Sequence, residues 1–144
     1  MKRSVPVPDK KRLEGRHARW EKITREAVKQ CRRSRPMRIE PVRTFQETLE
    51  LAESYERKFI FYEDATSVLS PDPVGSAKPA GVFVLIGPEG GFDRAEVDTA
   101  RQKGFVSLGM GPRILKAETA ALTAGALLQF AFGDMGGAAD QNSP

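Results

Sequence analysis

The sequence has very little of the side chains that most often bind metals or cross-link a chain. Among its 144 residues, Cys31 is the only cysteine and His17 the only histidine. A single cysteine excludes a disulfide within the chain. One cysteine and one histidine are also too few for a typical Cys/His zinc site, and serine–histidine catalysis would depend on His17 alone. Because His17 lies among lysines and arginines, we expect a polar helix residue there and no metal site.

Long apolar runs are absent as well. No uninterrupted stretch approaches the roughly 20 residues that span a bilayer, and no apolar run follows the basic N-terminus, which argues against a secretory signal. With 40% apolar and 29% charged residues, the composition is typical of a soluble protein. We therefore expect one cytoplasmic domain with a single core and no membrane contact.

Positive charge is concentrated at the start of the chain. Residues 1–43 hold 15 lysines and arginines against 5 acidic residues, a net of +10, whereas residues 44–144 carry a net of −6. Such a block is most often a solvated helix face, but it is also typical of a surface that binds phosphates. The asymmetry slightly favours nucleic acid as a partner.

The first part of the chain is predicted to be helical. Apolar residues at helical spacing predict an amphipathic helix over residues 10–35. Its inward face is expected to carry Leu13, Trp20, Ile23, Ala27 and Cys31. Residues 37–42 alternate weakly and would form at best a short edge strand. The capping pattern of Thr44 with Glu47 predicts a second helix through about residue 56.

The rest of the chain alternates between strands and helices. Strands are expected over residues 58–62, 81–86 and 105–108, and helices over 93–103 and 118–132. The nearly all-apolar stretch 81–86 is typical of a strand buried on both faces of a parallel sheet. Residues 65–80, with three prolines, would form a flexible connector. This alternation predicts an α/β domain.

Two glycine-rich turns each follow a predicted strand, at residues 87–91 and 109–113. Ligands bind at the carboxyl ends of strands in open α/β sheets, and glycine lets the main chain approach them closely. Phosphate-loop spacing is missing, and Glu89 would repel a phosphate, so a neutral or cationic ligand suits the first turn better. Taken alone, such turns are also typical of simple helix caps.

Both turns, with their flanks, resemble one known family. The motifs are LIGPEGGF at residues 85–92 and SLGMGPRILKAETA at residues 107–120. In this order and spacing they resemble the ribosomal RNA small subunit methyltransferase E family of the SPOUT superfamily. The segments 3–5, 20–31 and 132–136 are similar as well.

This resemblance implies an enzyme that uses S-adenosylmethionine to methylate N3 of a uridine in 16S ribosomal RNA of the small ribosomal subunit. It also implies a SPOUT-type α/β fold, with a mostly parallel sheet, helices on both faces and a C-terminal trefoil knot, a rare exception to unknotted topology. Such proteins typically form homodimers with a shared active site. We expect the helix over 118–132 to form the dimer contact.

The resemblance further implies roles for individual residues. The cofactor pocket would be formed by Gly87, Glu89, Gly90, Gly91, Leu108, Gly109, Ile114, Leu115, Thr119 and Ala120. Arg113 and Glu118 would be the catalytic residues. Arg113 would stabilise the developing uracil anion or hold a phosphate, although a structural role in capping local carbonyls explains it equally well. Glu118 or Glu89 would face the positive sulfonium.

RNA contacts would come from two places in the sequence. Arg32, Arg33 and Arg35 belong to the basic block, and Lys116 follows the second glycine-rich turn. Lys116 stands where similar proteins usually carry arginine. Lysine keeps the charge but lacks the planar, bidentate fork, so a phosphate clamp there would be weaker.

The resemblance also implies an N-terminal PUA-like RNA-binding barrel and a first strand and helix of the catalytic domain, and we expect this chain to be without them. We therefore expect residues 1–137 to form an N-terminally truncated methyltransferase domain, with a disordered tail over 138–144. One alternative is a catalytically impaired RNA-binding remnant, in which the basic helix contacts phosphates. A general nucleotide-binding domain is the weakest alternative, because phosphate-loop spacing is missing.

Overall fold

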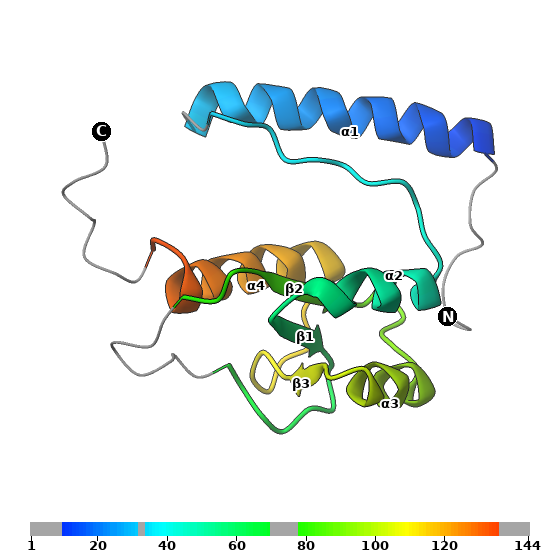
Figure 1. Cartoon of the computed structure of the whole chain (residues 1–144), viewed down its shortest axis with the longest axis vertical. Helices are drawn as coiled ribbons and strands as arrows, with labels where there is room; N and C mark the ends of the chain where they lie inside the picture. Colours follow the sequence, from blue (N-terminus) through cyan, green and yellow to red (C-terminus); the bar gives the residue numbers. More distant parts are fainter. Residues whose placement is uncertain (1–9, 32–33, 70–77, 136–144) are drawn as a thin grey trace. The chain divides into compact units, whose positions relative to one another are not determined.

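The structure, a computed structural model, describes residues 10–31, 34–69 and 78–135. The chain divides into two compact units, one comprising Val5–Thr48 and the other Met1–Ser4 with Leu49–Pro144 (Figure 1). Among the described residues, none of the helices is long and apolar enough to cross a membrane.

The second unit is built on a parallel sheet of three strands. Its strands are β1 (Arg57–Phe61), β2 (Val82–Ile86) and β3 (Val106–Leu108). They lie in the order β2-β1-β3, and Phe59 of β1 is in register with Val84 on one side and Val106 on the other. All three predicted strands and the α/β class are confirmed.

Helices pack on this sheet. Figure 1 shows α4 (Ala117–Phe132) along one side of the sheet and α3 (Arg94–Gln102) on the other. Phe59 and Phe61 form a buried cluster with Leu108 of β3 and Ala124 of α4. Ile60 alternates to the opposite face and is fully buried there. The core of this unit therefore lies on both faces of β1.

The expectation that the strand over 81–86 is buried on both faces is wrong. In the described sheet β2 is an edge strand, and only Leu85 among its residues is buried. The central strand is β1, whose Phe59, Ile60 and Phe61 are all buried. A strand with neighbours on both sides loses more surface than an apolar strand at the edge, and hydrophobicity alone does not reveal strand order.

Both predicted helix caps are confirmed. The main-chain N–H of Thr44 donates to Glu47 Oε2 at 2.7 Å, and Glu47 N–H donates to Thr44 Oγ1 at 3.2 Å. This main-chain bond holds the pKa of the Glu47 carboxyl below its usual value. At α3, Asp93 N–H donates to Glu96 Oε2 at 2.9 Å. The helix after Thr44 is shorter than predicted, since α2 spans Phe45–Leu51 and a 3₁₀ turn spans Ala52–Ser54.

The first unit contains α1 (Lys10–Cys31), which ends earlier than the predicted residue 35. Its expected inward face is partly wrong, because Trp20 is 41% and Ile23 54% exposed, whereas Thr24 is buried. Apolar spacing identifies a helix face but not what covers it. As expected, His17 is a polar helix residue, and its Nε2 hydrogen-bonds the Ile39 carbonyl oxygen at 3.0 Å.

The predicted edge strand over 37–42 is wrong, since this segment has no strand pairing among the described residues. Pro36 and Pro41 lack the main-chain N–H that a ladder needs. The connector over 65–80 is only partly described, because residues 70–77 lie outside the described ranges. Its first part is ordered: Val68 forms a parallel bridge with Gly109, and Gly109 N–H donates to the Ser67 carbonyl oxygen at 2.7 Å.

Candidate functional site

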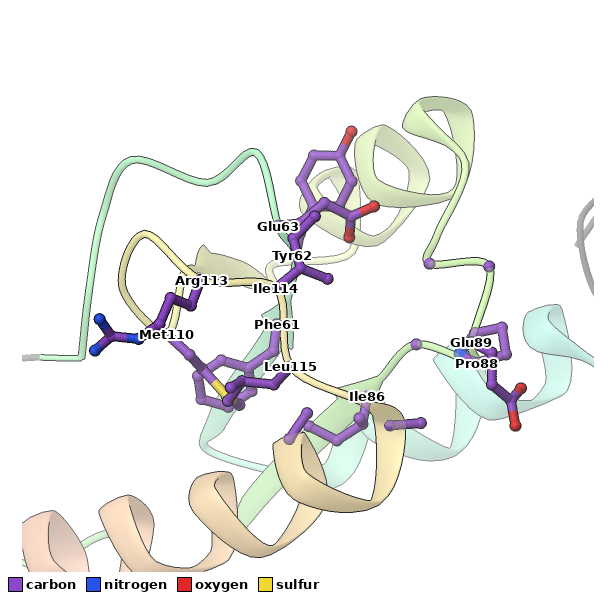
Figure 2. Close-up of a pocket in the computed structure, with 15 residues that line it drawn as sticks. Phe61, Tyr62, Glu63, Ile86, Pro88, Glu89, Met110, Arg113, Ile114 and Leu115 are labelled. Atoms are coloured by element: carbon purple, nitrogen blue, oxygen red, sulfur yellow. The ribbon is translucent and has the colours of Figure 1, made fainter.

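A cavity of about 230 Å³ opens at the carboxyl ends of β1 and β2 (Figure 2). Three segments enclose it: the end of β1, the glycine-rich turn after β2, and the chain between β3 and α4. Its lining residues are Phe61, Tyr62, Glu63, Ile86, Gly87, Pro88, Glu89, Gly90, Gly91, Met110, Arg113, Ile114, Leu115, Ala117 and Ala120. This edge of a parallel sheet is where ligands bind in open α/β folds.

The turn over 87–91 folds tightly back on itself. Gly91 N–H donates to the Pro88 carbonyl oxygen at 2.9 Å, and Gly91 has a φ of +70°, which residues with a side chain resist. A Cβ at Gly87 would lie 3.3 Å from both the Gly91 Cα and the Phe92 ring. Glycine at these two positions therefore keeps the turn compact and its main chain at the cavity surface.

The opposite wall runs from the end of β3 into α4. Met110, Arg113, Ile114 and Leu115 line it before the helix begins. Lys116 is the N-cap residue of α4, and its carbonyl oxygen accepts a bond from the Ala120 N–H at 2.8 Å. The first turn of α4 presents small alanine side chains to the cavity, which leaves room beside the helix.

Most residues expected to form the cofactor pocket do line this cavity. They are Gly87, Glu89, Gly90, Gly91, Ile114, Leu115 and Ala120, and Arg113 joins them. Leu108 and Gly109 lie outside the lining, since Leu108 belongs to the buried core cluster and Gly109 pairs with the connector. Glu118 and Thr119 are exposed on α4 and are not among the lining residues.

The residues expected to bind RNA are only partly described. Arg35 is exposed after α1, and Lys116 is exposed at the start of α4. They belong to different units of the chain. Arg32 and Arg33 lie outside the described residues.

Phe61, Tyr62 and Glu63 also line the cavity, and the sequence reasoning missed them. All three lie at the carboxyl end of the central strand β1. The signal that could have found them is this position, because the ends of neighbouring parallel strands meet at one sheet edge. The Tyr62 hydroxyl donates to Asp64 Oδ2 at 2.8 Å, and this bond raises the pKa of Tyr62.

The cavity combines apolar walls with a few charges. Glu63 and Glu89 are its acidic lining residues and Arg113 its basic one. In Figure 2, the Arg113 guanidinium points away from the glycine-rich turn. No histidine or cysteine lines the cavity, and the described residues contain no group of side chains suited to hold a metal ion. The arrangement suits a reaction in which a bound molecule carries the reactivity and the protein orients it.

The comparisons with known proteins define the class. A family model described as an RNA methyltransferase domain matches residues 1–129. The chain belongs to this family.

Its relatives carry a more specific name. Ribosomal RNA small subunit methyltransferase E of Bacillus subtilis is 35% identical over 127 residues, covering 85% of this chain and 50% of that protein. The protein of the same name from Mesomycoplasma hyopneumoniae is 36% identical over 111 residues. The chain spans about half the length of these relatives.

Solved structures agree with this fold. A methyltransferase from Legionella pneumophila, in complex with its bound cofactor S-adenosylmethionine, superposes with a TM-score of 0.80 at 31% identity, covering 90% of this chain and 52% of that one. Ribosomal RNA small subunit methyltransferase E from Neisseria gonorrhoeae, bound to S-adenosylmethionine, gives a TM-score of 0.77 at 31% identity, with 92% and 54% covered. Both confirm an α/β fold similar to known methyltransferases.

Proposed function

We propose that this chain methylates ribosomal RNA of the small ribosomal subunit with S-adenosylmethionine as methyl donor, at N3 of a uridine in 16S ribosomal RNA, in the cytoplasm. The observation that carries the proposal is the cavity between the glycine-rich turn and the segment leading into α4. It lies in a chain that is similar to methyltransferases solved with that cofactor.

The lining residues fit S-adenosylmethionine. Phe61, Ile86 and Leu115 offer apolar surface of the kind that suits an adenine ring, and the turn over 87–91 brings main-chain atoms to the cavity surface. The acidic lining residues suit the positive sulfonium. When bound, this cofactor supplies an electrophilic methyl group, and transfer is an in-line displacement that depends mainly on orientation.

Two residues are proposed to act on the reacting groups. Arg113, at the cavity wall formed before α4, would stabilise the negative charge that develops on uracil as N3 loses its proton. Glu118 lies in the first turn of α4, next to Ala117 of the cavity lining. It is the second proposed catalytic residue and would face the positive sulfonium. Of the remaining proposed cofactor residues, Leu108 and Gly109 would support the wall that begins at Met110, whereas Thr119 lies exposed in the first turn of α4.

We also propose a C-terminal trefoil knot and a homodimer formed through α4. The support for the dimer is that α4 leaves large apolar side chains exposed, with Leu122 at 77% and Phe130 at 55%. We expect the chain to sediment as a dimer and Leu122→Asp to sediment as a monomer. A monomeric wild-type chain at micromolar concentration would contradict the dimer.

Titration calorimetry with S-adenosylmethionine tests the cavity assignment. We expect binding heat for the wild-type chain and none when Gly90 and Gly91 are both replaced by leucine. At Gly91 the φ of +70° disfavours any side chain, and a Cβ would lie 2.5 Å from Glu63 Oε1. Gly15→Leu is the matched control, because a Cβ at Gly15 on α1 has no atom within 4 Å. Unchanged binding in the double variant would refute the assignment.

A catalytically impaired RNA-binding chain is the second candidate. The observation that favours it is the exposed basic surface of α1, formed by Arg16, Arg19, Lys22, Arg25 and Lys29. It predicts RNA binding that weakens as the salt concentration rises. Replacing Arg32, Arg33 and Arg35 together by glutamate should weaken binding further and reduce the slope of the logarithm of the binding constant against the logarithm of the salt concentration by about 2. Methylation of unmodified small-subunit RNA by the isolated chain would exclude this candidate.

A further inference from the structure

The cavity contains a carboxylate that lies directly against the glycine-rich turn. Glu63 follows the central strand β1, and a Cβ built on Gly91 would lie 2.5 Å from Glu63 Oε1 and 3.1 Å from its Oε2. The Glu63 carboxylate therefore occupies the space that a side chain at position 91 would need. Figure 2 shows it at the same side of the cavity as the turn.

This carboxylate has no partner among the described residues: no hydrogen bond or ion pair joins Glu63 to another of them. Two nearby side chains do not bind it. The Tyr62 hydroxyl donates to Asp64, and the Arg113 guanidinium points away from the turn in Figure 2. Glu63, an exposed side chain, thus presents its negative charge to a cavity that has both apolar and polar walls.

The other acidic candidates are placed less well for a bound cation. Glu118 is not among the cavity-lining residues. The Glu89 carboxylate, as Figure 2 shows, points away from Met110 and Leu115 on the opposite wall. Glu63 and Glu89 both line the cavity, and Glu63 is the one whose carboxylate lies against the glycine-rich turn.

We infer that Glu63 binds the cationic part of the methyl donor, an inference that rests on the proposed function. S-adenosylmethionine carries two positive groups, the sulfonium and the α-ammonium, and either would gain a charge-assisted contact with a carboxylate. The same charge repels phosphates. It therefore keeps the RNA backbone from the turn side of the cavity and leaves Arg113, on the opposite wall, as the cavity residue suited to contact RNA.

Glu63→Gln removes the charge and keeps the shape of the side chain. We expect the dissociation constant for S-adenosylmethionine, measured by calorimetry, to rise roughly tenfold, as for loss of one charge-assisted contact. S-adenosylhomocysteine lacks the sulfonium charge and 5′-methylthioadenosine lacks both positive groups. If Glu63→Gln loses the same affinity for S-adenosylmethionine and S-adenosylhomocysteine, Glu63 contacts the ammonium. If it loses affinity for S-adenosylmethionine alone, Glu63 contacts the sulfonium.

Binding of 5′-methylthioadenosine is expected to be unchanged in Glu63→Gln. A similar loss for all three ligands would mean a general change in the cavity, and no loss for any would mean that the charge plays no part; either result overturns the inference. Asp98→Asn removes an exposed carboxylate on α3 outside the cavity and serves as the charge-matched control. A wild-type chain that binds none of the ligands would refute the proposed function, and the role of Glu63 with it.

Discussion

Phe59→Ala is expected to lower the free energy of unfolding by about 3–5 kcal/mol, the usual range for removing a buried aromatic ring. Phe59 is 8% exposed on the central strand β1. Its ring stacks on Phe132 of α4 with centroids 6.0 Å apart and an interplanar angle of 10°. Truncation would leave a cavity between sheet and helix, in a fold whose total stability is typically about 5–15 kcal/mol. Urea unfolding followed by circular dichroism measures the change.

The matched control for Phe59→Ala is Val106→Ala on the neighbouring strand β3. Val106 is 51% exposed, so its truncation is expected to cost well below about 1 kcal/mol. Equal losses for the two variants would mean that the Phe59–Phe132 contact is not central to the core. Phe61 belongs to the same cluster as Phe59 and also lines the cavity. We therefore expect Phe59→Ala to weaken ligand binding as well as stability.

The elements of this fold were largely predictable because their signals are local. The capping boxes at Thr44 and Asp93 specify helix starts through bonds between residues three apart in sequence. The order of the strands in the sheet, by contrast, is not determined by any local sequence signal. The central position of β1 depends on which strands pair with it, and the more hydrophobic segment 82–86 lies at the edge of the described sheet.

The candidate site was predictable only where its residues belong to local sequence motifs. The turn over 87–91 and the segment containing Arg113 are visible as glycine-rich motifs, and both line the cavity. Glu63 carries no such motif, and its closeness to Gly91 arises only when β1 and β2 lie side by side. The exposed Trp20 of α1 shows the converse, since a clear apolar pattern says nothing about what covers it.

Gly109→Ala is expected to lower the free energy of unfolding by about 1–3 kcal/mol, as overpacking does, and to weaken S-adenosylmethionine binding at least about tenfold. A Cβ at Gly109 would lie 2.7 Å from the main-chain oxygen of Ala65. Main-chain atoms cannot rotate away as a side-chain end can, so the bond from Gly109 N–H to the Ser67 oxygen would be strained or lost. The cavity wall begins at the next residue, Met110.

The control for Gly109→Ala adds the same methyl group where there is room. A Cβ at Gly125, within α4, has no atom within 4 Å, and alanine there should raise the free energy of unfolding by about 0.5–1 kcal/mol because glycine is unfavourable inside a helix. The two variants are thus expected to change stability in opposite directions. If unfolding and calorimetry showed Gly109→Ala to be as stable as the wild type and to bind the cofactor equally well, the contact between the connector and Gly109 would not hold the cavity wall.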